Sequence, residues 1–251
     1  MLRSHLFNVV FYLNTAVFLL LGSPLLFGPR SWAMAGLRAH ARTSLWWMRV
    51  IVGTRIEVRG LDRLPPAPVL IAAKHQSAWE TFALIPFFRD PAMVMKAELG
   101  LIPFYGWFSR KFEHILVRRE RGPAALRDML KVARRRRDSA RDIVIFPEGT
   151  RQKVSAPPAY KSGVAALYAD LDIPCVPVAL NSGLFWPRDS FSRQPGTIIV
   201  EFLDPIPAGH QRRKFLSELE KEIETATAEL VREAVENQAS HASEGGLNSE
   251  H

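Results

Sequence analysis

Two short polar clusters, each placed after an apolar stretch, carry the residues that could do chemistry. The first is KHQSAWE at residues 74–80, in which the carboxylate of Glu80 follows His75 by five positions. The second is FPEGTR at residues 146–151, which supplies another carboxylate and Arg151. A histidine that a carboxylate can orient is suited to deprotonating a hydroxyl nucleophile. Because an arginine fork suits phosphate oxygens, the clusters predict one site with a base and an anion pocket.

Glu80 has a second role available in the helix that is expected to start after His75. Residues 77–80 match a capping box, with Ser77 at the N-cap and Glu80 three positions later. This local pattern fits a helix cap as well as it fits catalysis, and both roles coincide if the first helical turn brings Glu80 back to the imidazole. A metal site is not expected, because His75 and Glu80 share no helical face and no second ligand pair is present.

The clusters lie in a chain that alternates between strand and helix patterns from residue 54 onwards. Strands are predicted at 55–58, 69–73, 92–96, 115–117, 143–146, 175–180 and 198–202. Helices are predicted near 77–88, 103–109, 123–139 and 161–171. This alternation predicts an α/β fold with a mixed, mostly parallel sheet covered by helices. His75 then lies where a buried strand reaches the surface, which is the usual place for sites in such sheets.

Further cations and a glycine could complete an anion pocket. Lys96 ends a predicted strand, Arg119 follows another, and Lys161 begins a predicted helix. Gly149 in the second cluster permits a tight turn or the close approach of a ligand. Any one of these cations alone would be an ordinary surface charge, whereas several that converge would bind phosphate.

The N-terminal segment 1–52 is predicted to associate with a membrane through two helices. Residues 6–28 carry no charge and are long enough to span a bilayer, although two asparagines and Pro24 make a clean span marginal. The helix expected over 31–51 combines tryptophans with a stripe of arginines, as interfacial helices do. The arginines of the stripe are Arg38, Arg42 and Arg49. A cleaved signal peptide is the main alternative, disfavoured because the small residues 33–35 lie well beyond the apolar core.

Charge is spread unevenly along the 251 residues. Residues 211–251 hold five basic and nine acidic side chains, a net charge of −4. Since the whole chain carries +8, residues 1–210 carry about +12. A basic body favours anionic partners, such as phosphorylated ligands, an anionic lipid surface or an acidic carrier protein. Nucleic acid is not expected, because the arginines at 134–137 end a predicted helix and no base-stacking aromatics accompany them. The single Cys175 excludes an internal disulfide.

On these motifs the chain resembles the glycerolipid acyltransferases, and within them the bacterial 1-acyl-sn-glycerol-3-phosphate acyltransferases. The family block N-H-x-x-x-x-D corresponds to residues 74–80, with Lys74 in the first place and Glu80 in the carboxylate place. The block G-x-x-F-I-x-R is matched loosely by residues 115–119, which end on Arg119, and F-P-E-G-T-R is complete. The apolar fourth block corresponds to residues 173–178.

The resemblance implies transfer of a fatty acyl group from a thioester, either acyl-CoA or acyl carrier protein, to the 2-hydroxyl of lysophosphatidic acid. His75, held by Glu80, is then the base, and phosphatidic acid is the product. The implied substrate-binding residues are Lys96, Arg119, Glu148, Gly149, Thr150 and Arg151. Neither a cofactor nor a metal is expected. Two alternatives stay open: another acceptor, such as glycerol-3-phosphate or a lyso-aminolipid, and a non-catalytic membrane lipid-binding protein. A lipid hydrolase is disfavoured because the G-x-S-x-G elbow is missing.

Pattern and resemblance together divide the chain into four parts. Residues 1–52 are the membrane-associating helices and 53–210 the acyltransferase domain. Residues 211–238 are expected to form an amphipathic helix and 239–251 a disordered tail. The expected location is the inner (cytoplasmic) membrane, with the site facing the cytoplasm.

Overall fold

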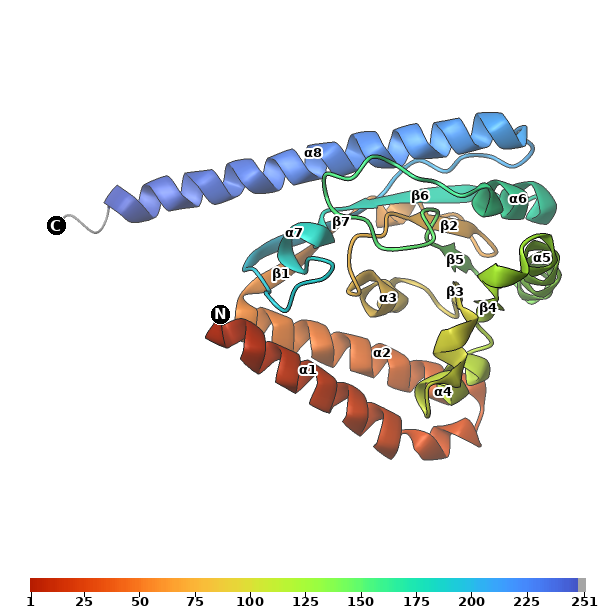
Figure 1. The fold of residues 1–251 in the computed structure, drawn as a ribbon, viewed down its shortest axis with the longest axis horizontal. Helices are drawn as coiled ribbons and strands as arrows, with labels where there is room; N and C mark the ends of the chain where they lie inside the picture. The colour runs from red at the N-terminus through yellow and green to blue at the C-terminus, as the bar shows by residue number, and fades with distance from the viewer. Residues whose placement is uncertain (248–251) are drawn as a thin grey trace.

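A seven-stranded sheet lies at the centre of the chain in the computed structural model, which describes residues 1–247 (Figure 1). The strands are β1 (Thr54–Arg59), β2 (Leu70–Ala73), β3 (Ala92–Lys96), β4 (Ile115–Val117), β5 (Ile143–Ile145), β6 (Cys175–Leu180) and β7 (Gly196–Phe202). Their order is β1-β7-β6-β2-β5-β3-β4, and every neighbouring pair is parallel except β6 and β7. The mixed, mostly parallel sheet predicted from the sequence is confirmed.

Helices cover both faces of the sheet, which explains why its central strands are continuously apolar in sequence. The helices are α1 (Leu2–Leu21), α2 (Arg30–Trp47), α3 (Glu80–Ala83), α4 (Tyr105–Lys111), α5 (Pro123–Asp138), α6 (Ser162–Leu171), α7 (Ser182–Phe185) and α8 (Arg212–Leu247). Successive residues of β2 point to opposite faces. Ile71 belongs to the core that α1 and α2 share, whereas Leu70 belongs to the core formed with α5, α6 and α8. The central strand β2 is therefore buried throughout.

The two N-terminal helices form an antiparallel hairpin that lies along one face of the sheet (Figure 1). Asn14 of α1 donates hydrogen bonds to the hydroxyls of Thr43 and Ser44 of α2, at 3.1 and 2.9 Å. Among the described residues, α1 is the helix long and apolar enough to cross a membrane by length and composition, with a mean hydropathy of 1.6. Asn14 thus serves helix pairing, whereas Asn8 donates to the carbonyl of Phe191 at 2.8 Å and ties α1 to the segment before β7.

Three local expectations differ from the structure. The helix predicted over 77–88 is reduced to α3 and a 3-10 turn at Ile85–Phe87, since Pro86 has no N–H and disfavours helical geometry in the residue before it. Helix α8 continues past 238 to Leu247. This covers most of the tail predicted to be disordered, and residues 248–251 lie outside the described part of the chain.

The third difference concerns the arginine stripe of α2. Arg38 is half-buried and donates a hydrogen bond to the carbonyl of Phe88 at 3.1 Å, so it stabilises the body of the protein and does not face outwards. Arg42 and Arg49 are exposed as expected.

Candidate active site

Four neighbouring strands bring the predicted site residues to one edge of the sheet. Strands β2, β5, β3 and β4 are adjacent and parallel, so their carboxyl ends lie together. His75 follows β2, the FPEGTR segment follows β5, Lys96 ends β3, and Arg119 follows β4. The expectation that the two polar clusters form one site is supported by the contacts between them.

His75 and Glu80 form the central pair of this edge. The Nδ1 atom of His75 lies 3.1 Å from an Oε atom of Glu80. Glu80 is fully buried, whereas the His75 side chain keeps 12% of its surface exposed. A carboxylate can only accept, so Nδ1 carries the hydrogen and Nε2 keeps its lone pair. In the neutral imidazole, Nε2 is therefore the nitrogen that can accept a proton.

The capping box expected at 77–80 forms only in part, because α3 begins at Glu80 with Trp79 at its N-cap and no side-chain hydrogen bond caps it. The two oxygens of Glu80 accept the backbone N–H of Ser77 at 2.9 and 3.0 Å, and one of them accepts the N–H of Gln76 at 3.3 Å. The Ser77 hydroxyl accepts the N–H of Trp79 at 3.1 Å. The same carboxylate thus ends the loop after β2 and holds the imidazole, because α3 begins directly after that loop.

Ser182 at the start of α7 is a site residue that the sequence analysis missed. Its buried hydroxyl donates a hydrogen bond to Glu80 across 102 positions of sequence. Next to it, the N–H of Gly183 donates to the side-chain oxygen of Gln76 at 3.0 Å. A Cβ at Gly183 would lie 2.9 Å from the Gln76 side chain, so glycine is required for this close approach. The only sequence signal was the position of this segment, directly after β6.

The FPEGTR segment packs directly on His75. The Phe146 ring stacks on the imidazole, with centroids 4.0 Å apart and an interplanar angle of 17°. The carbonyl of His75 accepts the N–H of Gln152 at 2.7 Å, just beyond the motif. The imidazole is therefore fixed by a carboxylate at Nδ1 and by an aromatic face, which leaves Nε2 to meet a substrate.

Glu148 lies beneath this loop and is fully buried. One of its oxygens lies 3.4 Å from the N–H of His75 and 3.3 Å from the ammonium of Lys74. Its other oxygen has no hydrogen-bond partner among the described residues. Burial raises the pKa of the Glu148 carboxyl, and the positive charge of Lys74 acts against that rise.

The predicted phosphate-binding cations are brought together only in part. Arg119 donates to the carbonyl of Gly149, which has a φ of 69° that favours glycine. Within residues 1–247, the side chains of Lys96 and Arg151 make no hydrogen bond or ion pair, and Thr150 is exposed. Uncommitted cations at the same edge as His75 are available to an anionic ligand.

Other chemistries are poorly served by the described residues. They contain no group of three or more His, Cys, Asp or Glu side chains that could hold a metal ion. Cys175 is fully buried in β6, and burial raises the pKa of its thiol, which keeps the sulfur protonated and unreactive. The arrangement at His75 thus suits deprotonation of a hydroxyl that attacks an external electrophile.

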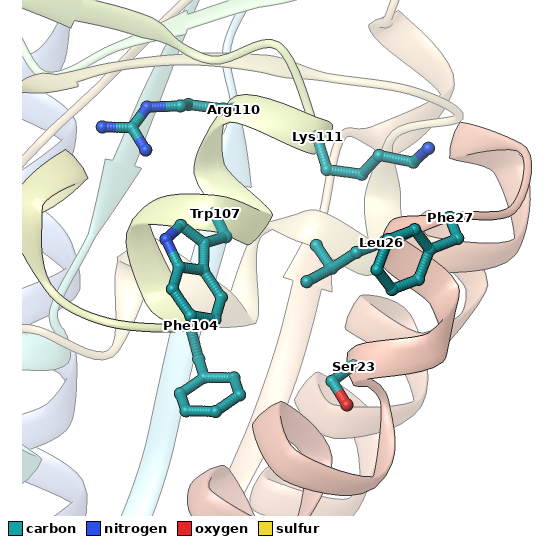
Figure 2. Close-up of a pocket in the computed structure, with 7 residues that line it drawn as sticks. All are labelled: Ser23, Leu26, Phe27, Phe104, Trp107, Arg110 and Lys111. Atoms are coloured by element: carbon teal, nitrogen blue, oxygen red, sulfur yellow. The ribbon is translucent and has the colours of Figure 1, made fainter.

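A separate open hollow of about 660 Å³ lies between the turn after α1 and the helix α4. Figure 2 shows Phe104 and Trp107 on one side of it and Leu26 and Phe27 on the other, with Lys111 nearby. His75 does not line this hollow. Its apolar walls and cationic neighbours suit the chain and headgroup of a lipid.

Comparison with known proteins gives a consistent result. The profile of the family described as Acyltransferase matches residues 55–181. The 1-acyl-sn-glycerol-3-phosphate acyltransferase of Pseudomonas aeruginosa is 34% identical over 202 residues, which cover 80% of this chain and 79% of that protein. The protein of the same name from Saccharomyces cerevisiae is 28% identical over 192 residues, covering 74% of this chain and 63% of its own length.

A solved structure shows the same fold. The crystal structure of the 1-acyl-sn-glycerophosphate (LPA) acyltransferase, PlsC, from Thermotoga maritima matches with a TM-score of 0.77 at 20% identity. The match covers 91% of this chain and 96% of that one, so it includes the two N-terminal helices as well as the sheet.

Proposed function

The chain belongs to the acyltransferase family, and on that premise we propose that it makes phosphatidic acid. It transfers a fatty acyl group from a thioester to the 2-hydroxyl of 1-acyl-sn-glycerol-3-phosphate, a step of phospholipid biosynthesis. The observation that carries this proposal is the His75–Glu80 pair, whose imidazole stacks on Phe146 of the FPEGTR segment.

The proposed mechanism is direct acyl transfer. The free hydroxyl of the acceptor gives its proton to Nε2 of His75 as its oxygen attacks the thioester carbonyl carbon. Glu80 stabilises the imidazolium that forms, because a buried carboxylate beside a developing positive charge is worth most in a site with little water. The C–S bond then breaks, and the leaving sulfur takes the proton from His75. No covalent acyl-enzyme is needed.

Substrate binding rests on charges at the same edge. We assign the acceptor phosphate to Arg151, Arg119 and Lys96, because these cations follow neighbouring strands. Gly149 and Thr150 shape the turn that presents Arg151. The unpartnered oxygen of Glu148 is available to accept a hydrogen bond from the glycerol part of the acceptor.

Product analysis tests the proposal. Purified protein is incubated with a labelled acyl thioester and, in separate reactions, with lysophosphatidic acid, glycerol-3-phosphate or a lyso-aminolipid. We expect labelled phosphatidic acid as the main product of the first reaction. If another acceptor gives the main product, the acyl-transfer chemistry stands and the assigned substrate is wrong. If no acceptor gives a product, the alternative of a non-catalytic lipid-binding protein is favoured.

Membrane association is the second part of the proposal. The apolar helix α1 is consistent with it. Large apolar side chains are exposed on α1, on the turn after it and next to α4, among them Leu13, Leu20, Phe27, Leu101 and Trp107. A surface of this kind suits contact with lipid. We place the protein at the inner (cytoplasmic) membrane with the basic body and the site on the cytoplasmic side, in line with the positive-inside rule.

This proposal keeps the division of the chain near residue 52 and assigns the docking role to residues 1–52. The buried residues Phe7, Met34 and Met48 show that this segment is also part of the core. Deleting it would therefore expose apolar surface and cause aggregation. Point changes on its outer face are a cleaner test.

We expect Leu13→Glu combined with Leu20→Glu to weaken binding to vesicles of anionic phospholipid by about a hundredfold or more, on the order of the free energy of burying two leucines. Flotation measures the bound fraction. Ala228→Glu, at an exposed position of α8, is the matched control and should bind as the parent does. Unchanged flotation of the double variant would rule out this face as the membrane contact.

A further inference from the structure

A buried ion-pair cluster lies directly beneath the proposed site. Lys74, the residue before His75, keeps only 2% of its side chain exposed, which is rare for lysine. Its ammonium lies 3.3 Å from an oxygen of Glu148 and makes a closer contact with Glu224 of α8. The cluster joins the end of β2, the FPEGTR segment and the C-terminal helix, three segments far apart in sequence.

Glu224 is itself held from a second side. The hydroxyl of Tyr160 donates a hydrogen bond to it at 3.0 Å, and the Lys74 ammonium lies 5.9 Å from the centre of the Tyr160 ring. Burial, together with the carboxylates of Glu148 and Glu224, raises the pKa of Tyr160, so the phenol stays protonated and remains a donor. Tyr160 therefore supports the position of Glu224 without adding charge.

Helix α8 is fixed against the sheet on both sides of Glu224. Leu219 and Ile223 are buried in the core that includes Leu70 of β2, and Leu230 is buried further along. The side chain of Asn181 donates to the carbonyl of Leu230 at 3.3 Å. The family profile matches residues 55–181, so α8 lies outside the matched part. The contact that Glu224 makes with Lys74 therefore involves a residue that the profile does not cover.

We infer that Lys74 is a positioning residue that keeps Glu148 ionised and in place for the acceptor, and that Glu224 of α8 holds the Lys74 ammonium. An isolated carboxylate in this position would be driven to its neutral form, because burying an unpaired charge costs more than protonation. With Lys74 beside it, Glu148 stays an acceptor, and its unpartnered oxygen is free for a substrate hydroxyl. This inference rests on the proposed function for the identity of the acceptor.

The groups that face Glu148 determine the direction of each effect. Lys74 and His75 approach it from the end of β2, Tyr160 lies in the chain before α6, and Glu224 comes from α8. Lys74→Met removes the stabilising positive charge while keeping most of the buried stem, so the pKa of Glu148 rises. Glu224→Gln keeps an oxygen for Lys74 and Tyr160 but removes a negative charge, so the pKa of Glu148 falls. The two variants thus act in opposite directions.

Carboxyl NMR on protein labelled with ¹³C-glutamate tests the inference without relying on activity. The Glu148 signal is identified by its loss in Glu148→Gln. We expect Glu148 to titrate at higher pH in Lys74→Met than in the parent, and at lower pH in Glu224→Gln. Glu229→Gln, at an exposed position of α8, is the matched control. An unshifted Glu148 signal in Lys74→Met would overturn the inference.

Kinetics with lysophosphatidic acid provide the second readout. We expect Lys74→Met to lower kcat/KM for the acceptor at neutral pH by about ten- to a hundredfold, the usual worth of a hydrogen bond to a charged group. The acid limb of the pH profile should move to higher pH. In the Glu148→Gln background, Lys74→Met should have little further effect, and an equal shift there would mean that Lys74 acts on His75, which overturns the inference.

The two readouts separate the two proposals. In one outcome the parent protein forms no phosphatidic acid with any acceptor, while the Glu148 signal is shifted in Lys74→Met. That outcome would refute the proposed function and leave Lys74 as the group that keeps Glu148 ionised. Phosphatidic acid formation by the parent, with an unshifted Glu148 signal in Lys74→Met, would refute the inference alone.

Discussion

Replacing His75 with alanine should lower kcat for phosphatidic acid formation by roughly 10²–10⁴, the usual contribution of a positioned general base. The imidazole is the group at this edge whose free nitrogen can take the hydroxyl proton, since Nδ1 is engaged by Glu80. Initial rates with a labelled thioester and saturating lysophosphatidic acid measure the effect.

The His75→Ala protein should remain folded, because only a partly exposed side chain is removed. Loss of the stacked ring leaves the Phe146 face uncovered, so a small fall in melting temperature is expected. His210→Ala is the matched control, since His210 lies in the turn before α8 and its side chain contacts Glu218 of that helix. Near-parent turnover by folded His75→Ala would remove His75 from the mechanism.

Local sequence patterns predicted the parts of the site that follow single strands. The apolar segments identified all seven strands, and the polar residues directly after them identified His75, Glu148 and Arg119 as neighbours. The capping pattern at 77–80 predicted the return of Glu80 to the imidazole, because that contact spans only five residues. These features could be predicted because each depends only on residues that are close together in the sequence.

The contacts that the sequence could not predict join segments far apart in the chain. Ser182 reaches Glu80 across 102 positions, and Lys74 reaches Glu224 across 150. Each depends on which strand lies beside which, and on where α8 crosses the sheet. A lysine next to a motif histidine looks like an ordinary surface charge in sequence, and only the packing of α8 over β6, the neighbour of β2, brings Glu224 to it.

The same limit applies to the N-terminal helices. Arg38 was interpreted as part of an interfacial stripe, and Asn14 as a residue that makes a membrane span marginal, yet both turn inwards, to Phe88 and to α2 respectively. A polar residue in an apolar helix is costly in lipid and also costly in a protein core without a partner. The sequence shows the polar residue but not the partner, so the direction it faces was not predictable.

The Glu80 carboxylate is the remaining test of how the site works, because it has both a structural and a catalytic role. Glu80→Gln keeps the size of the side chain but replaces one oxygen with an amide group. Both oxygens of Glu80 now accept from Ser77, and they also accept from His75 and Ser182. The amide N–H₂ must therefore face a donor, and we expect a stability loss of about 1–3 kcal/mol, measured by thermal unfolding.

The effect on turnover should be much larger than this stability loss explains. If the amide nitrogen takes the position next to His75, Nδ1 must become the acceptor, and the proton moves to Nε2, where the base needs a lone pair. The negative charge that stabilises the imidazolium is lost at the same time. We expect Glu80→Gln to lose on the order of a hundredfold or more in kcat, by analogy with neutralising the acid of other His–acid pairs.

Two companion variants separate charge from shape. Glu80→Asp keeps the charge on a shorter side chain and should retain much of the activity. Ser182→Ala removes one donor to the carboxylate but leaves the contacts with Ser77 and His75, so its loss should be smaller than that of Glu80→Gln. If folded Glu80→Gln turns over at the parent rate, Glu80 acts only by holding the backbone of the loop before α3. The orientation of the imidazole would then come from its stacking on Phe146 and from the backbone contact with Gln152.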